Sequence, residues 1–393
     1  MTLASNLYKL YLIKISKWFM LTMPIIVLFY QENGLGMKEV LLLQGIYSVA
    51  IVAIEIPSGY FADVWGRKGT IIIGAFLGVI GFLIYSFSYG FWGFLIAELV
   101  LGVGQSFISG SDSALLYDSL LLEGKENSYT KIEGRILSIG NFAETIAAIL
   151  GGLIAEISLR MPFIVQIFVA LIAIPAAFTL VEPNTAIKQK NRWKTILSVL
   201  KTTLIKNKEL QSLILFTAFI GTATLTMAWF IQPYLKNILN LSFTEIGLSL
   251  SLLNLIVGLT TLFAYKVENY LGRTKILIFI IIGITTTYFL MSFYSYKMIF
   301  VAMAVFYFSR GLATPILKDY INRSTSSDIR ATVLSIRNFS IRIVFAIAGP
   351  LWGWYSDKYS LQAALLIAGF VILISSIISL AFYLLAAKKS TNV

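Results

Sequence analysis

The chain consists largely of apolar runs that are each long enough to cross a bilayer, which takes about 20 residues of helix. Hydrophobic residues make up 58% of the 393 residues and charged residues only 13%. Backbone groups in lipid must be satisfied within each segment, and these runs lack the alternation of barrel strands. The sequence therefore predicts an all-α membrane protein with twelve transmembrane helices, at residues 8–30, 38–62, 70–88, 91–121, 133–157, 160–181, 210–236, 244–267, 275–293, 297–320, 330–356 and 360–386.

The residue types that are missing exclude several kinds of chemistry. The chain has no cysteine and no histidine, which excludes disulfides, thiolate or imidazole metal sites and Ser-His or Cys-His nucleophiles. It also has no G-x-x-x-x-G-K-[ST] phosphate loop. We expect no enzymatic activity, no cofactor and no metal, and the groups available to carry protons are Asp and Glu.

The basic residues indicate how the chain is oriented. With the amino terminus in the cytoplasm, 23 of the 31 Lys and Arg residues fall on the cytoplasmic side and 5 outside, as the positive-inside rule requires. The first run lacks a cleavage site and is expected to be a retained helix. We expect a multi-pass protein of a bacterial cytoplasmic membrane, with both termini cytoplasmic. The net charge of +12 then reflects orientation and anionic lipid, and no nucleic-acid partner is expected.

The two halves of the chain resemble each other. Residues 136–142 recur at 333–339, residues 110–118 at 311–319, and Gly66-Arg67 at Gly272-Arg273. These matches keep their order at offsets of 197, 201 and 206 residues. We therefore expect two six-helix bundles, residues 1–181 and 210–393, related by an axis along the membrane normal. A basic cytoplasmic linker, residues 182–209, joins them.

The turn between the second and third runs carries a fairly specific motif. It contains Gly59, Asp63, Gly66, Arg67 and Lys68, in the pattern G-x-x-x-D-x-x-G-R-K. This pattern resembles the signature loop of the major facilitator superfamily, and within it the chain resembles bacterial drug/proton antiporters. The resemblance implies two bundles that rock about a central site to give alternating access.

The same resemblance implies a cytoplasmic latch that holds one state closed. Arg67 is expected to reach Asp118, and Asp63 to lie near the amino end of the eleventh span, residues 330–332, where an anion is favoured by about 0.3–1 kcal/mol. The alternative is a simple surface turn. The second copy departs from the motif, with Asn269 in the place of Asp63.

Several ionisable residues fall inside the predicted spans, at a cost of about 2.5–3.5 kcal/mol for a charge at a helix centre. The four acids belong to the first half and the three arginines to the second. They either form oppositely charged walls of a cavity, where a carboxylate exchanges a proton, or they pair and hold one conformation. The first reading assigns proton coupling to Asp112 and Glu144, while a structural role is favoured for Glu55 and Glu98, which lie nearer the span ends. The residues are Glu55, Glu98, Asp112, Glu144, Arg310, Arg337 and Arg342.

The resemblance also implies which residues line the substrate cavity. Asp112 and Arg310 would lie on the lining, with Glu144 and the other two arginines beside it, and the seventh span would add an amphipathic wall. The implied cavity set is Asp112, Trp229, Gln232, Tyr234, Arg310, Arg337 and Arg342.

Two departures weaken the antiporter subclass: Glu98 precedes Gly102 where an arginine is usual, and Gly151-Gly152 replaces the usual Gly-Pro.

The function expected from this resemblance is secondary active transport. The chain would act as a monomer in the lipid bilayer and export a small amphipathic molecule in exchange for protons. The alternatives are a metabolite importer or facilitator of the same fold, and a transport-dead scaffold or sensor.

Overall fold

The computed structural model describes residues 5–125, 128–183, 207–294, 296, 299–325 and 329–390. The expected basic linker therefore lies mostly outside the described residues. The chain divides into two compact units. Unit 1 holds residues 1–35, 42–188 and 241–251, and unit 2 holds residues 36–41, 189–240 and 252–393.

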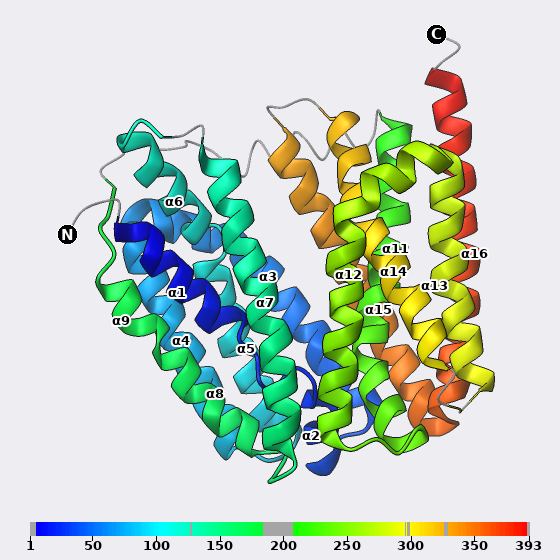
Figure 1. Cartoon of the computed structure of the whole chain (residues 1–393), viewed down its shortest axis with the longest axis horizontal. Helices are drawn as coiled ribbons and strands as arrows, with labels where there is room; N and C mark the ends of the chain where they lie inside the picture. The colour runs from blue at the N-terminus through cyan, green and yellow to red at the C-terminus, as the bar shows by residue number, and fades with distance from the viewer. Residues whose placement is uncertain are drawn as a thin grey trace. The chain divides into compact units, whose positions relative to one another are not determined.

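Unit 1 is built from helices throughout its described residues (Figure 1). Two of its helices, α4 (Arg67–Phe87) and α5 (Gly90–Ile108), pack closely because glycines face each other. A Cβ on Gly74 would lie 2.9 Å from the carbonyl oxygen of Gly104. The elements are α1 (Asn6–Trp18), α2 (Ile26–Glu32), α3 (Met37–Trp65), α4 (Arg67–Phe87), α5 (Gly90–Ile108), α6 (Ser111–Leu122), α7 (Tyr129–Ala155), α8 (Met161–Leu171) and α9 (Ala173–Phe178).

Unit 2 is likewise helical in its described residues (Figure 1), and α11 ends in a π-helical turn over Tyr234–Ile238. The first residues of α12 belong to unit 1, and the first residues of α3 belong to unit 2. The remaining helices are α11 (Lys208–Pro233), α12 (Phe243–Leu271), α13 (Arg273–Phe293), α14 (Ile299–Arg323), α15 (Arg330–Lys358) and α16 (Leu361–Ser390).

The lengths of the helices confirm an all-α membrane protein and correct one span. In the described residues, eleven helical segments are long and apolar enough to cross a membrane. The expected continuous first span, residues 8–30, is wrong, because α1 ends at Trp18 and α2 begins at Ile26. Buried Gln166 stabilises the break by accepting the Leu21 N–H at 2.8 Å and donating to the Phe19 carbonyl at 3.0 Å.

The expected fourth span, residues 91–121, also contains a break. Helix α5 ends at Ile108, and Gly110 has a φ of +86°, which glycine adopts without strain. Asp112 therefore lies in the first turn of α6, where a negative charge is favourable. The apolar run is continuous in sequence, so hydropathy alone could not reveal this turn.

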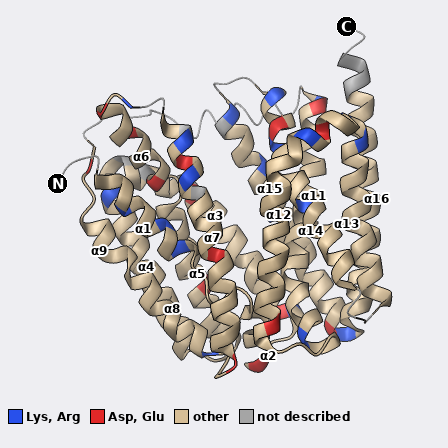
Figure 2. Ribbon diagram, viewed as in Figure 1, with Lys and Arg blue, Asp and Glu red and all other residues tan. Residues whose placement is uncertain are grey.

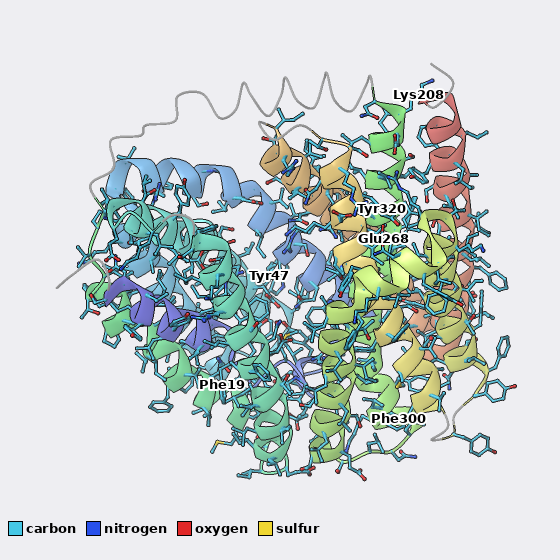
Figure 3. All side chains as sticks on the ribbon, turned by 45° about the horizontal axis from the view of Figure 1, so that its top comes forward. Phe19, Tyr47, Lys208, Glu268, Phe300 and Tyr320 are labelled. Atoms are coloured by element: carbon cyan, nitrogen blue, oxygen red, sulfur yellow. The ribbon has the colours of Figure 1, made fainter. Side chains whose placement is uncertain are left out.

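The outer faces of both units are suited to lipid. Large hydrophobic side chains are exposed along the helices, for example Leu259, Ile282 and Ile377 at 60%, 57% and 51%, and side chains project from all the helices in Figure 3. Figure 2 shows that charged residues are concentrated toward the helix ends. This pattern is that of a multi-pass membrane protein, in which apolar helix faces contact hydrocarbon.

Candidate functional site

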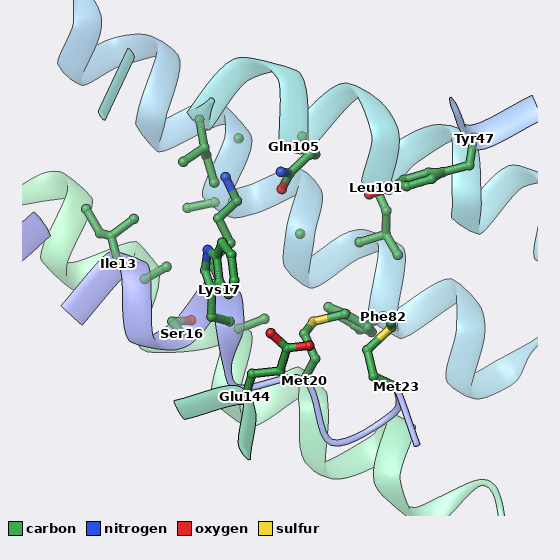
Figure 4. A pocket seen from close by; sticks show the side chains of 18 residues that line it. Ile13, Ser16, Lys17, Met20, Met23, Tyr47, Phe82, Leu101, Gln105 and Glu144 are labelled. Atoms are coloured by element: carbon green, nitrogen blue, oxygen red, sulfur yellow. The ribbon is translucent and has the colours of Figure 1, made fainter. Parts of the chain in front are cut away.

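Unit 1 contains a cavity of about 260 Å³ whose lining is mainly apolar (Figure 4). Helices α1, α3, α4, α5, α7 and α8 contribute to it. Three polar side chains that can bind a ligand's charged or polar group line it from different helices: Lys17, Gln105 and Glu144. Tyr47 and Phe82 add aromatic surface, and the other apolar lining includes Ile13, Trp18, Met20, Met23 and Leu101.

The break after α1 places Lys17 at this cavity. Lys17 is in the last turn of α1, directly before the backbone turns away at Phe19. A cation at a helix carboxyl end is stabilised by the helix dipole. Glu144 reaches the same cavity from the middle of α7, so that a positive and a negative group both face the same space.

One turn before Lys17, Lys14 forms an ion pair with Asp112, with 3.8 Å between Nζ and Oδ2. Both side chains are largely buried, at 11% and 14% exposure. Asp112 also accepts the backbone N–H of Ser113 at 2.7 Å. The structure thus places Asp112 in an ion pair outside the lining of the unit 1 cavity.

A second polar cluster surrounds Glu98, which is 4% exposed. Tyr30 donates its hydroxyl to Glu98 Oε1 at 2.7 Å, and the Gln44 side-chain amide donates to the same oxygen. Because Tyr30 gives its proton to Glu98, the Tyr85 hydroxyl donates to the Tyr30 oxygen. Within the described part of the chain no Lys or Arg forms an ion pair with Glu98.

This cluster and the unit 1 cavity share two helix faces. Glu98 and Gln105 are seven residues apart on α5, so they lie on one face about 10 Å apart at 1.5 Å per residue. Gln44 and Tyr47 are similarly three residues apart on α3. Hydrogen-bond donors stabilise the charged form of a carboxyl such as Glu98, and apolar surroundings stabilise its neutral form. A carboxyl that has both can exchange a proton.

Arg160 closes the end of the unit next to this cluster. It donates to the backbone carbonyls of Ser86 at 2.8 Å and Ser88 at 3.0 Å, and to the Asn33 side chain at 2.8 Å. Its guanidinium lies 5.0 Å from the ring centroid of Phe29. Arg160 is therefore satisfied by carbonyls and an aromatic face.

The signature turn forms the contact expected of it in unit 1. Arg67 makes an ion pair with Asp118, whose side chain is 8% exposed. Gly66 begins α4 with a φ of +83°. Glu182 accepts the backbone N–H groups of Arg67 at 2.8 Å and Lys68 at 2.6 Å. Its carboxylate thus caps the amino end of α4.

The related turn in unit 2 uses different partners. Gly272 has a φ of +77° and begins α13. Arg273 pairs with Glu209 at 3.2 Å and stacks on Tyr320, at 4.4 Å from the ring centroid. Asp319, the counterpart of Asp118, pairs with Arg323 at 2.7 Å. Tyr320 is labelled beside Glu268 in Figure 3.

Unit 2 has its own cavity of about 310 Å³, formed by α11, α14 and α15. Arg337 and Arg342 line it together with Asn338. Two of the three arginines expected at a cavity are therefore brought to one space. The remaining lining is Thr217, Ile220, Gly221, Thr224, Leu225, Ala313, Thr314, Leu317 and Ile341.

Other residues of the expected site lie elsewhere. Arg310 lies 5.7 Å from the ring centroid of Tyr307, outside both cavity linings. Tyr234 and Gln232 are buried, at 0% and 2% exposure, and neither they nor Trp229 line either cavity. Gly59 lies within α3. The Asp63 side chain, and with it the expected contact to residues 330–332, lies outside the described residues.

Sequence reasoning missed Lys17, Gln105, Glu182 and the hydrogen-bonded environment of Glu98. A signal for Lys17 existed, because it falls inside the predicted first span, residues 8–30, where a cation needs a partner or a cavity. The partners of Glu98 are up to 68 residues away in the chain, and no local pattern links them.

Comparisons with known proteins agree with this architecture. The model of the Major Facilitator Superfamily matches residues 15–226 and 214–393. An uncharacterized MFS-type transporter of Methanocaldococcus jannaschii is 22% identical, over 85% of this chain and 86% of its own length. The uncharacterized MFS-type transporter YxaM of Bacillus subtilis is 23% identical, over 90% of both chains.

Solved structures of transporters share the fold. The nucleoside transporter NupG has a TM-score of 0.82 at 15% identity, covering 98% of this chain and 99% of its own. A bacterial homolog of the human lysosomal transporter Spinster, inward-facing and unoccupied, has a TM-score of 0.78 at 15% identity, covering 98% and 97%. The chain is a multi-pass transporter and not an enzyme, and it belongs to the Major Facilitator Superfamily.

Proposed function

We propose that this protein exports a small amphipathic molecule in exchange for protons, by alternating access. The observation that carries the proposal is the unit 1 cavity, in which Lys17, Gln105 and Glu144 interrupt an aromatic and thioether lining. Ligand sites of this kind are mostly apolar, with a few polar groups that fix orientation. An amphipathic molecule matches such a lining better than a fully polar one.

Proton coupling is supported by carboxyl groups that lie in or near apolar surroundings. Glu144 lines the cavity, Asp112 pairs with Lys14, and Glu98 is buried among hydroxyl and amide donors. Intramembrane acids commonly mark proton relays. Of the three, Glu98 is the most deeply buried and has no ion-pair partner in the described residues, so we assign it the coupling proton and Glu144 contact with the substrate. Asp112 then balances the positive charge of Lys14, its ion-pair partner.

The signature turn is proposed to control switching. The Arg67–Asp118 pair and the Glu182 cap fix the start of α4 against α6. Breaking this set of contacts would change the rate of switching and leave the cavity lining intact. We further propose a bacterial cytoplasmic membrane location, with both termini in the cytoplasm, and a monomeric transporter.

The direct test is reconstitution of the purified protein in liposomes, with a panel of amphipathic anions, cations and neutral molecules. Export coupled to protons predicts that an imposed pH gradient drives accumulation of at least one of them. If a substrate moves equally fast in both directions and the pH gradient has no effect, the result would support a facilitator. Binding without any movement would support a transport-dead sensor.

A further inference from the structure

We propose that Arg337 and Arg342 bind the negatively charged group of a small organic anion, a carboxylate or a phosphate monoester. This inference rests on the proposed function and names its substrate class: the transported molecule is an organic anion, and the unit 2 cavity is a second site for it, in addition to the unit 1 cavity.

Among the described residues, neither of the two guanidinium groups has an acidic partner. Arg337 donates through Nη1 to Asn338 at 3.1 Å, and its buried Nε has no acceptor. Arg342 has neither a hydrogen bond nor an ion pair within the part of the chain that the structure describes. A cation inside a membrane protein is costly unless it is paired or faces water. The cavity that both arginines line provides room for an anion.

Both arginines line the same cavity although they are about 140° apart around the axis of α15, at about 100° per residue. They are five residues apart on α15, which is about 7.5 Å along the axis at 1.5 Å per residue. Guanidinium groups bind carboxylates and phosphates with two parallel hydrogen bonds, and their side chains are long enough to converge. Asn338, between them on the chain, can add an amide donor.

The rest of the lining indicates what the anion carries. Thr217 and Thr224 donate their hydroxyls to the carbonyls of Leu213 at 2.7 Å and Gly221 at 2.8 Å. Toward the cavity they therefore present only acceptor lone pairs. Ile220, Leu225 and Ile341 are apolar. The volume of about 310 Å³ holds roughly ten waters at about 30 Å³ each, enough for a ring with one anionic substituent and a hydroxyl or amine.

The experiment measures binding of four matched probes to the full-length protein in detergent by isothermal titration calorimetry. The probes are benzoate, phenyl phosphate, neutral benzamide and cationic benzylamine. We expect wild-type protein to bind benzoate or phenyl phosphate at least about tenfold more tightly than the other two. The proposal also requires that Arg337→Gln and Arg342→Gln each weaken anion binding by about tenfold, equal to about 1.4 kcal/mol, while Arg337→Lys retains part of it.

Two control variants make the result specific. Arg323→Gln removes an arginine whose side chain is 68% exposed, in the same unit but outside the cavity, and should leave binding unchanged. Lys17→Gln removes a cation from the unit 1 cavity. The proposal is overturned if benzamide binds as tightly as both anions, or if Lys17→Gln abolishes anion binding while both arginine variants keep it.

Failure of the site and failure of the proposed function give different results. If the anions bind through the arginines but are not transported in liposomes, the site stands and the transport proposal fails. If transport of an anion is found and neither arginine variant changes its affinity, transport stands and this site is wrong. Arg337→Lys keeps the test decisive if a glutamine variant does not fold, because it retains the charge.

Discussion

Replacing Glu98 should uncouple transport from protons without preventing it. The cluster holds a single buried carboxyl, so it can carry one proton per cycle. One proton moving down a gradient of one pH unit supplies about 1.4 kcal/mol, which supports at most about tenfold accumulation of the transported molecule. Glu98→Gln keeps the shape of the side chain but cannot ionise, so accumulation should fall to about onefold while downhill exchange continues.

The assay follows a radiolabelled substrate in liposomes, with the membrane potential clamped to zero. Tyr30→Phe perturbs the same cluster more mildly, because it removes one hydrogen bond that stabilises the charged Glu98 carboxylate. The carboxyl takes this charged form each time it releases its proton. Such a bond is worth about 1.5 kcal/mol or more, so coupled exchange should slow about tenfold.

The matched control is Tyr288→Phe in unit 2. Tyr288 is also fully buried, and its hydroxyl donates to the Ala223 backbone carbonyl at 2.7 Å. It should leave coupled exchange within about twofold, since the lost bond, about 1 kcal/mol, is to a neutral group. If the Glu98→Gln variant still accumulated the substrate tenfold, the assignment of the coupling proton to Glu98 would be refuted. Asp112 or Glu144 would then be the candidates for proton coupling.

Three further predictions concern switching, backbone geometry and topology. Arg67→Ala should slow exchange while substrate affinity, measured by calorimetry, stays within a few fold; loss of binding would contradict a role in switching. Gly66→Ala should lower stability to denaturant by about 1–3 kcal/mol because its φ is +83°, whereas Gly258→Ala, in the open middle of α12, should be neutral or stabilising; equal effects would argue against strain at Gly66. In intact cells an impermeant thiol reagent should label Ile157→Cys and spare Lys125→Cys, and the reverse pattern would invert the topology.

The architecture was predictable from the sequence because the physics of the bilayer acts on each segment separately. Apolar runs of about 20 residues can only be helices in lipid, and the Arg67–Asp118 pair followed from the signature turn. The breaks at residues 19–25 and at Gly110 were not predictable from hydropathy, since their backbone groups are satisfied by a distant residue such as Gln166, or need only a glycine.

The candidate site was predicted in part for a related reason. A charge inside a span is costly unless it has a cavity or a partner, and this rule singled out Glu144, Arg337 and Arg342, which line the two cavities. That Arg337 and Arg342 line the substrate cavity stays a prediction. Depth along a helix does not specify which way a side chain faces, and Arg310 and Tyr234, both expected at the substrate cavity, line neither the unit 1 nor the unit 2 cavity. The role of each residue in transport stays a prediction.

Proton movement that accompanies substrate movement tests the central claim most directly. Wild-type protein would be reconstituted in liposomes containing a trapped pH-sensitive dye, and an outward gradient of each panel member would be imposed with no initial pH difference. Proton-coupled export predicts that at least one substrate changes the internal pH, that a protonophore abolishes the change, and that Glu98→Gln lacks it. Substrate efflux with a constant internal pH would contradict the account and identify a facilitator.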